Sequence, residues 1–235
     1  MSSNVISIDG PSGSGKTSIG KMLSGRLNAD FLSSGLIYRM ITINISEISK
    51  DDKYKQYISD LSIFYKDCLE NRFNIEIVNF SDSLISIIYT DNKTEKAFTY
   101  EAKFNDQQVY SVDVSILTSK FSQLAILRSA VSKYLNDYVD EKNLTVIEGR
   151  DIGSVVFKDA VMKIYIDSPI ELRAKRRLSQ SSNEEGIDNI AERDQMDKTR
   201  DNSPLIVPDG AFIVVNENQT IEEIVELLEK EYINL

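Results

Sequence analysis

Short runs of branched apolar residues recur along the chain, and each is followed by a polar turn and then by apolar residues at helical spacing. The first run, residues 5–8, ends at the turn D-G-P, and a helical pattern follows over residues 16–27. Runs of the same kind occupy residues 144–147, 164–166 and 212–215. Strands that are apolar on both faces and alternate with helices predict a parallel sheet wound with right-handed crossovers. We therefore expect an α/β fold with helices on both faces of the sheet.

Two of these runs lead into capping boxes, which mark the starts of helices. The segment S-P-I-E at 168–171 places a proline at the first helical position. The segment T-I-E-E at 220–223 precedes an apolar helical face. Both signals support the alternation of strands and helices.

The middle of the chain follows a different pattern. Three alternating stretches at 73–78, 84–89 and 97–104 are separated by polar turn clusters, which predicts a small antiparallel meander. An amphipathic stretch at 114–138 predicts a helix in two pieces, and the strand and helix alternation resumes at residue 144. We therefore interpret the meander as an insertion in the α/β core.

The composition excludes several chemistries. The chain has 235 residues with no histidine and one cysteine, so it offers no imidazole base, no disulfide within the chain and no multi-cysteine zinc site. The 37 acidic and 27 basic side chains give a net charge of −10, which argues against duplex DNA or an anionic membrane as the main partner. There is no 18-residue apolar run, and because residues 1–9 have neither a basic nor a long apolar region, we expect no secretory signal there. We expect a soluble cytoplasmic protein that binds neither nucleic acid nor membrane, with Cys68 in its core.

The glycine-rich turn after the first run carries the strongest chemical signal. Residues 10–17 satisfy the pattern G-x-x-x-x-G-K-S/T, which a chain of this length matches by chance about once in a hundred times. Glycines let backbone N–H groups converge on phosphate oxygens, Lys16 neutralises β/γ charge, and Thr17 offers a hydroxyl to Mg²⁺. The residues expected to bind the triphosphate are Gly10, Pro11, Ser12, Gly13, Ser14, Gly15, Lys16, Thr17 and Ser18.

A triphosphate loop alone leaves kinase, ATPase and GTPase open. A GTPase is disfavoured because the chain has no N-K-x-D motif and no suitably placed D-x-x-G switch. Three arginines, Arg173, Arg176 and Arg177, stand at helical spacing after 168–171 and share one face. Such a face favours an anion, although a solvated face paired with glutamates is an equal interpretation of these residues alone.

A second arginine face follows a polar segment. Arg193, Asp197 and Arg200 stand at i, i+4 and i+7, a spacing that also produces an intrahelical salt-bridge ladder. The polar, glycine-containing segment 179–186 lies between the two faces, and we interpret it as a mobile lid. Two arginine faces around such a segment favour a binding site for phosphoryl groups.

Arg39 and Arg150 complete the set of candidate phosphate ligands. Arg150 and Asp151 follow the run at 144–147, so they are expected at the carboxyl edge of the sheet, where open α/β folds bind their ligands. Phosphoryl transfer depends on positioning and charge neutralisation rather than on a strong acid or base. The absence of histidine is therefore consistent with a kinase.

Together these motifs resemble those of bacterial cytidylate kinases, in the family's order from near residue 4 to near residue 230. The matching segments lie at 8–16, 34–39, 148–157, 173–177 and 193–205. The segment E-G-R-D-I-G-S-V-V-F at 148–157 is the most discriminating, because other P-loop kinases lack it. The resemblance implies a P-loop fold and the transfer of the γ-phosphoryl group of ATP, with Mg²⁺, to CMP or dCMP.

The resemblance also implies a role for each matching residue. The implied catalytic residues are Lys16, Arg150, Arg176 and Arg200, with Arg176 reaching the transferring phosphate from the lid. The implied CMP-binding residues are Ser34, Arg39, Ser119, Arg128, Arg150, Asp151, Arg193, Asp197 and Arg200. Within this set Arg39, Arg150 and Arg200 would hold the phosphate, Asp197 and Ser34 the ribose, and Ser119, Arg128 and Asp151 the cytosine edge. Thr17 is the implied metal ligand.

The expected organisation is a single P-loop kinase domain over residues 1–235, acting as a monomer. Its expected parts are a core at about 1–40, 110–172 and 203–235, a monophosphate-binding insert at about 41–109 and a lid at about 173–192. The cationic residues expected to converge on one positive cleft are Lys16, Arg39, Arg128, Arg150, Arg176, Arg177, Arg193 and Arg200.

Four positions depart from the family pattern. Ser33 and Glu148 each replace a usual aspartate, and Ala125 and Lys158 each replace a usual proline. Glu148 keeps a carboxylate, which supports function. The alternatives are another small-molecule P-loop kinase, of the UMP/CMP, shikimate or dephospho-coenzyme A type, or a nucleotide-binding or RNA-binding module without turnover. The segment at 148–157 argues against other kinases, and the net charge argues against RNA.

Overall fold

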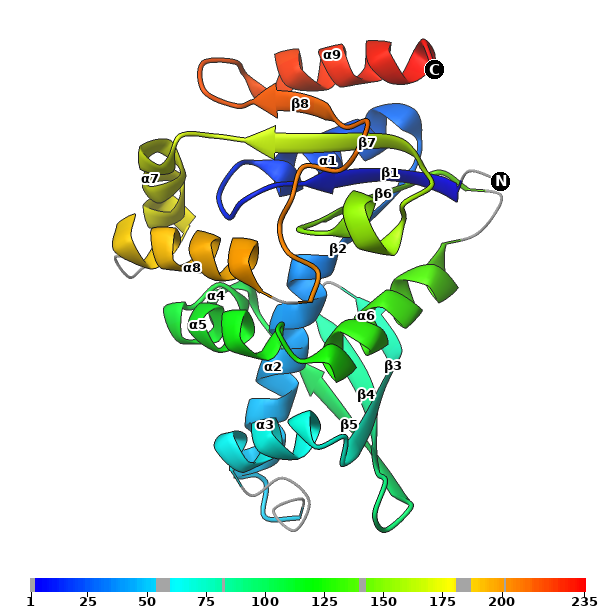
Figure 1. The fold of residues 1–235 in the computed structure, drawn as a ribbon, viewed down its shortest axis with the longest axis vertical. Coiled ribbons are helices and arrows are strands. Elements are labelled where there is room, and N and C mark those ends of the chain that lie inside the picture. Colours follow the sequence, from blue (N-terminus) through cyan, green and yellow to red (C-terminus); the bar gives the residue numbers. More distant parts are fainter. Residues whose placement is uncertain (1–2, 54–59, 82, 140–142, 181–186, 201) are drawn as a thin grey trace. The chain divides into compact units, whose positions relative to one another are not determined.

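The computed structural model describes residues 3–53, 60–81, 83–139, 143–180, 187–200 and 202–235 (Figure 1). The chain divides into two compact units. The first, Met1–Ser34 with Asp137–Leu235, contains the glycine-rich loop, and we call it the phosphate-loop unit. The second, Gly35–Asn136, contains the antiparallel stretches, and we call it the meander unit.

The phosphate-loop unit is built on a parallel sheet. Its elements are β1 (Ser3–Asp9), α1 (Lys16–Leu27), β2 (Asp30–Ser33), β6 (Thr145–Gly149), the π-helical segment η1 (Ile152–Val156), β7 (Ala160–Asp167), α7 (Ile170–Gln180), α8 (Ile187–Thr199), β8 (Phe212–Val215) and α9 (Ile221–Ile233). Within the described residues the sheet has five strands in the order β2-β6-β1-β7-β8, each parallel to its neighbours. β1 is the central strand, and Figure 1 shows β7 running along it. The predicted parallel sheet is confirmed.

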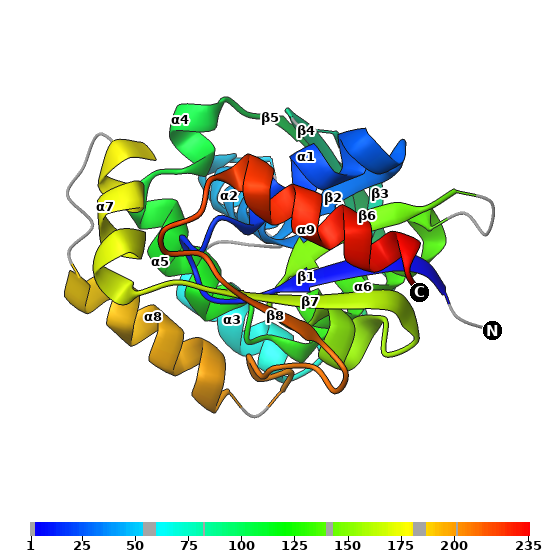
Figure 2. The ribbon, with the colours of Figure 1, turned by 90° about the horizontal axis from the view of Figure 1, so that it is seen from above.

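The strands are apolar on both faces because both faces of the sheet are covered. Ile6 and Ile8 are fully buried and form one core cluster with side chains of α1 and α9, and Figure 2 shows these two helices side by side. Ser7 alternates with Ile6 and Ile8 and therefore faces the opposite side of the sheet. Gly153 of η1 lies against Ser7 on that side. Helical segments thus cover both faces, as the sequence predicts.

The meander unit contains an antiparallel sheet and several helices. Its elements are α2 (Ser34–Lys50), α3 (Leu61–Leu69), β3 (Phe73–Ser81), β4 (Leu84–Asp91), β5 (Lys96–Lys103), α4 (Asp106–Val109), α5 (Val112–Phe121) and α6 (Ala125–Tyr138). In the described part of the chain the sheet has three strands in the order β3-β4-β5, each antiparallel to the next. The predicted meander is confirmed, and α5 with α6 confirms the helix predicted in two pieces.

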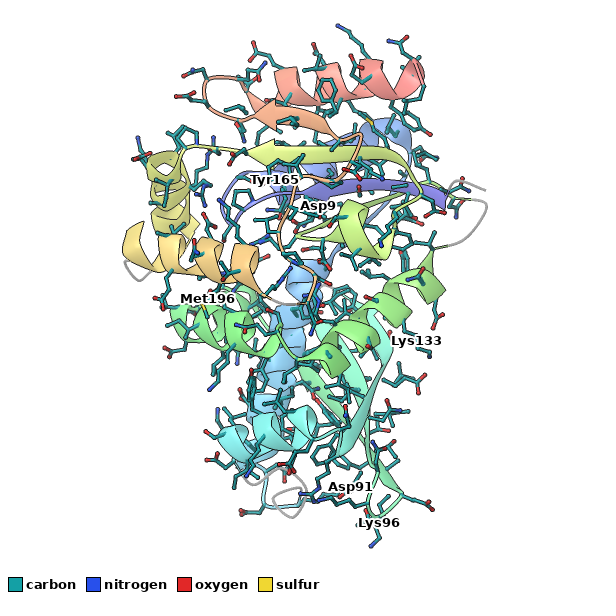
Figure 3. The ribbon with its side chains drawn as sticks, in the orientation of Figure 1. Asp9, Asp91, Lys96, Lys133, Tyr165 and Met196 are labelled. Carbon is teal, nitrogen blue, oxygen red and sulfur yellow. The ribbon has the colours of Figure 1, made fainter. Side chains whose placement is uncertain are left out.

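Aromatic side chains fill the core of the meander unit. The ring of Phe64 lies 5.3 Å from that of Phe73, and Tyr89 stacks on Phe98 with centroids 5.3 Å apart. Cys68 is also buried here, as predicted, and burial raises the pKa of its thiol to about 12. Figure 3 labels Asp91 and Lys96, which pair across the end of the β4–β5 hairpin. This core holds together through ring packing and apolar burial.

The two predicted capping boxes have different outcomes. The box at Thr220 is confirmed, because its hydroxyl accepts from the N–H of Glu223 and the Glu223 carboxylate accepts from the N–H of Thr220. The box at 168–171 remains a prediction: α7 begins at Ile170, one residue later than predicted, and the Ser168 hydroxyl accepts a hydrogen bond from Arg176.

Three elements near the site have no counterpart among the sequence predictions. They are the four-residue strand β2, the helix α2 that carries Ser34 and Arg39, and the segment η1 directly after Arg150 and Asp151. None of the helices in the described ranges combines the length and the apolar character that a membrane span requires. The division into core, monophosphate-binding insert and lid remains a prediction.

Candidate active site

The glycine-rich loop joins β1 to α1 at the carboxyl edge of the sheet. Gly10, Gly13 and Gly15 adopt φ values of 148°, 76° and 98°, which residues with a side chain rarely adopt. At Gly10 a Cβ would lie 2.0 Å from the carbonyl oxygen of Ile166, so only glycine fits beside β7. α1 then begins at Lys16, and its N-terminal N–H groups provide the positive end that binds phosphate.

Lys16 lies inside this loop with its ammonium group buried. Its Nζ donates to the carbonyl oxygen of Pro11 at 2.7 Å and to the hydroxyl of Ser14 at 3.4 Å. The pKa of Lys16 is lowered to about 7, mainly by burial and next by the positive charge of Arg150, while Glu148 opposes the shift. A bound phosphate would raise this pKa again, because an anion favours the charged form.

Thr17 and Ser33 share one carboxylate. The hydroxyl of Thr17 donates to Glu148 Oε1 at 3.0 Å, and that of Ser33 donates to the same oxygen at 2.5 Å. Ser33 and Glu148 are register partners in β2 and β6, so the two departures from the family pattern form one interaction. Hydroxyl and carboxylate oxygens are donors that Mg²⁺ takes, so the side chains of Thr17 and Glu148 fit a magnesium ion.

Four charged side chains form an alternating network after β6 and at the end of α8. Arg150 Nε contacts Asp197 Oδ2 at 2.8 Å, and Arg200 Nη1 contacts Asp197 Oδ1 at 3.4 Å. Arg200 Nη2 lies 3.9 Å from Asp151 Oδ1. The sequence singled out all four residues, and the structure brings them together within the phosphate-loop unit.

The charges of this network stabilise one another. Burial alone would raise the pKa of Asp197, but Arg150 and then Arg200 outweigh it and lower that pKa, with a smaller contribution from Arg193. Burial alone would lower the pKa of Arg150, and Asp197 outweighs it in the same way. α8 ends at Thr199, so Arg200 lies one residue beyond the predicted helical face, and its Nε donates to the carbonyl oxygen of Ser203. Two arginines that face one carboxylate form a site that a phosphate can enter.

The side chain of Arg173 is not on a solvated helix face, which was one of the two interpretations that the sequence left open. Its side chain is buried, and it donates to the carbonyl oxygens of Ser168 at 2.9 Å and of Ser12 at 3.1 Å. It also forms an ion pair with Asp194 of α8 at 2.6 Å. Arg173 therefore joins α7, α8 and the glycine-rich loop.

Arg176 faces the loop through Asn216, a residue that the sequence analysis did not identify. Arg176 Nη2 donates to the Oδ1 of Asn216 at 3.2 Å, and Asn216 Nδ2 donates to the carbonyl oxygen of Ser14 at 2.8 Å. A Cβ at Gly15 would lie 2.5 Å from that Nδ2. Asn216 directly follows β8, and its position at the carboxyl end of a predicted strand is the sequence signal that could have identified it as a site residue.

The middle of the predicted lid, residues 181–186, lies outside the described residues, and so does the side chain of Arg177. Ser34, the first residue of α2, is buried, and its hydroxyl lies against Gly149, where a Cβ would be 2.5 Å away. Ser18 is exposed on α1, and Arg193 is half-buried on α8. Their predicted contacts with ligands remain predictions.

The remaining predicted residues belong to the meander unit. Arg39 is buried on α2 and donates to the carbonyl oxygen of Val109 at 2.8 Å and to the hydroxyl of Ser115 at 2.9 Å. Arg128 of α6 donates to the carbonyl oxygen of Ser122 at 3.1 Å. Ser119 of α5 donates to the carbonyl oxygen of Ser115 at 3.1 Å. These contacts fix the three side chains within their own unit, and their roles toward CMP remain predictions.

Comparison with known proteins adds an independent line of evidence. Residues 6–234 match a family model described as cytidylate kinase. A protein named cytidylate kinase from Ureaplasma urealyticum serovar 10 is 30% identical over 239 residues, which cover 97% of this chain and 95% of that protein. One of the same name from Chlamydia caviae is 33% identical over 227 residues, which cover 94% of each chain. A third, from Fervidobacterium nodosum, is 30% identical and covers 94% of this chain and 92% of its own length.

Proposed function

Because the chain belongs to the cytidylate kinase family, we propose that it transfers the γ-phosphoryl group of ATP to CMP or dCMP. The observation that carries this proposal is the network of Arg150, Asp197 and Arg200 in the same compact unit as Lys16. The arginine pair suits the phosphate of an acceptor, and Lys16 in its loop suits the phosphate chain of a donor. Two phosphate sites in one unit favour transfer over simple nucleotide binding.

The donor side follows from the glycine-rich loop. The N–H groups of the loop and of the first turn of α1 would hold the β- and γ-phosphates, and Lys16 would leave its contacts with Pro11 and Ser14 for phosphate oxygens. Thr17, with Glu148 behind it, would hold Mg²⁺, which supplies charge neutralisation between the phosphates when bound. Lys16 then stabilises the charge that develops as the bond between the γ-phosphorus and the β,γ-bridging oxygen breaks.

The acceptor side follows from the charge network. Arg150 and Arg200, which pair with Asp197, would also bind the CMP phosphate. One oxygen of that phosphate would attack the γ-phosphorus in line and become the bridging oxygen of CDP. Asp197 would then accept from the ribose hydroxyls, together with Ser34. Asp151 would accept from the exocyclic amine of cytosine, which uracil lacks. Arg176 would neutralise charge on the transferring group, and Arg193 would add to the field at the acceptor.

The meander unit would supply the remaining acceptor contacts. By their match to the family, Arg39 would bind the CMP phosphate, and Ser119 and Arg128 the cytosine edge. Mutual positioning of the substrates and charge neutralisation would promote the transfer, which needs no histidine. We further propose that the protein works in the cytoplasm as a monomer, supported by its acidity and by the small-molecule substrates of the reaction.

A screen of acceptors tests the proposal. The purified protein is supplied with ATP and Mg²⁺, and ADP release is measured with CMP, dCMP, UMP, AMP, shikimate and dephospho-coenzyme A in turn. We expect the highest kcat/KM with CMP and dCMP, and release at background when a chelator removes the metal. ADP release that needs no acceptor, or a higher kcat/KM with a different acceptor, would overturn the assignment.

A further inference from the structure

Asp9 is a buried carboxylate that neither the triphosphate motif nor the proposed mechanism uses. It is the last residue of β1, directly before the glycine-rich loop, and its side chain is fully buried (Figure 3). Its Oδ1 accepts the N–H of Ile152 at 2.8 Å, and its Oδ2 accepts the N–H of Gly153 at 2.7 Å. Each oxygen therefore fixes one backbone group at the start of η1.

Asp9 contacts the residue before and the residue after the Arg150–Asp151 pair. In the sheet Asp9 is the register partner of Gly149, the residue before Arg150. Through its side chain it binds Ile152, the residue after Asp151. The dipeptide that the proposed function assigns to the acceptor is thus fixed at its two ends by one residue.

Close packing leaves η1 little freedom to settle elsewhere. A Cβ at Gly153 would lie 2.4 Å from the hydroxyl of Ser7 and 3.3 Å from Asp9 Oδ2. A side chain at this position of η1 would therefore collide with the hydroxyl of Ser7 on β1. Asp9 supplies the polar partners for the two N–H groups at this tight junction, and such groups are costly to bury without partners.

The chain continues from Asp9 into the loop that holds Lys16. The backbone at Gly10 is itself fixed, because its close approach to Ile166 admits no side chain. Asp9 therefore connects two parts of the site. Its backbone continues into the glycine-rich loop, and its side chain and its strand partner hold the segment that carries Arg150 and Asp151.

We propose that Asp9 is a positioning residue that sets the Arg150–Asp151 pair against the phosphate loop. The naming of that pair as acceptor ligands rests on the proposed function. The positioning itself is a property of the fold and does not depend on which acceptor binds.

The test compares Asp9→Asn with Asp91→Asn. Asp91 is the matched control, because it is also a buried aspartate at the end of a strand and also accepts two backbone N–H groups. An asparagine at position 9 keeps the shape but turns an N–H₂ group toward one of the two donors, so it loses one charge-assisted hydrogen bond. We expect the KM for CMP to rise about tenfold or more in Asp9→Asn, with the KM for ATP within about twofold of the wild type.

Hydrogen exchange supplies a readout that needs no turnover. We expect the amides of Ile152 and Gly153 to exchange at least about tenfold faster in Asp9→Asn and to be unchanged in Asp91→Asn. A second variant, Gly153→Ala, keeps the Asp9 carboxylate but crowds the junction between η1 and β1, and we expect the same rise in the KM for CMP. Gly153→Ala provides the kinetic test if Asp9→Asn fails to fold.

The outcomes separate the two proposals. Unchanged exchange at Ile152 and Gly153, or an equal rise in the KM values of CMP and ATP, would overturn the positioning role of Asp9. A wild-type protein without acceptor-dependent turnover would overturn the proposed function alone, because the exchange measurement would still decide the role of Asp9.

Discussion

Asp9 and Asp91 are the last residues of strands β1 and β4, and each accepts two backbone N–H groups, yet the two units hold their charges differently. In the meander unit, burial would raise the pKa of Asp91, but the N–H of Lys93 and the guanidinium of Arg72 outweigh burial and lower it. In the phosphate-loop unit, burial dominates and raises the pKa of Asp9 to about 6, despite its two hydrogen bonds.

The same contrast extends to the cations. Arg72 is paired with both Asp67 and Asp91, at 2.8 and 3.2 Å, and its pKa is raised because these partners outweigh burial. Lys16 donates to neutral oxygens, and burial lowers its pKa to about 7. The meander unit thus uses charge to hold its hairpin, whereas Asp9 and Lys16 of the phosphate-loop unit lie where burial disfavours their charged forms. Such groups are typical of sites that bind a charged ligand.

Replacement of Lys16 should give the largest effect. Lys16→Met removes a cation from the transferring phosphoryl group, and we expect kcat to fall by about a thousandfold. Because burial already disfavours the charge, we expect the midpoint of unfolding to stay the same or to rise. Steady-state kinetics and thermal unfolding check both parts, with Lys133→Met on exposed α6 as the control. A Lys16→Met variant with a normal rate would contradict the role of the loop.

The pH dependence of stability should separate Asp9 from an ordinary carboxylate. The folded state raises its pKa from 3.8 to about 6, so it binds the proton more tightly than the unfolded state. The stability due to Asp9 is therefore full below pH 3.8 and is lost as the pH rises through about 6, by about 3 kcal/mol in total. Urea unfolding from pH 4 to pH 7.5 should show Asp9→Asn gaining on the wild type as the pH rises. A constant difference between the two would contradict the shift.

Base recognition should respond to Asp151. Loss of its carboxylate in Asp151→Ala removes the acceptor for the cytosine amine, and we expect the KM for CMP to rise about tenfold while that for ATP stays nearly constant. Initial rates with each substrate varied in turn measure both constants. Asp159→Ala, an exposed aspartate eight residues away, serves as the control. Equal increases in the two KM values would rule out base reading by Asp151.

The smallest effect should come from the hairpin of the meander unit. Asp91→Asn weakens its bonds with Arg72 and with the turn, and we expect a loss of about 1 kcal/mol in the free energy of unfolding. We expect kcat and both KM values to remain unchanged. Chemical denaturation and steady-state kinetics on the same preparation test this pair of expectations. A change in kcat would contradict a purely structural use of charge in this unit.

Most of the fold follows from the sequence because its signals are strong and local. The apolar runs of β1, β6, β7 and β8 and the polar turns of the meander each mark their element without reference to distant residues. β2 was not predicted because it is only four residues long and its first two residues are not buried. η1 was not predicted because the segment I-G-S-V-V, with three branched apolar residues, carries no helical signal, and its close contact with Ser7 of β1 cannot be read from local sequence.

The candidate site is predictable as a set of residues but not as a set of contacts. Helical spacing places Arg173 and Arg176 on one face, yet it does not indicate that Arg173 is buried against Asp194 and the loop. Ser33 and Glu148 stand 115 positions apart, and only the pairing of β2 with β6 brings their side chains into contact. Contacts between distant strands are beyond what periodicity and motif spacing encode.

The position of β1 at the centre of its sheet also has a consequence for the order in which the chain folds. Val5 pairs with Thr145, and Asp9 pairs with Tyr165, so β1 has no partner strand until most of the chain exists. The meander unit is one continuous stretch, Gly35–Asn136, and its strands pair with their immediate neighbours in sequence. Contacts of short sequence separation form faster than contacts that close long loops. We therefore expect the phosphate loop to be among the last parts of a newly made chain to fold, later than the meander unit that follows it in the sequence.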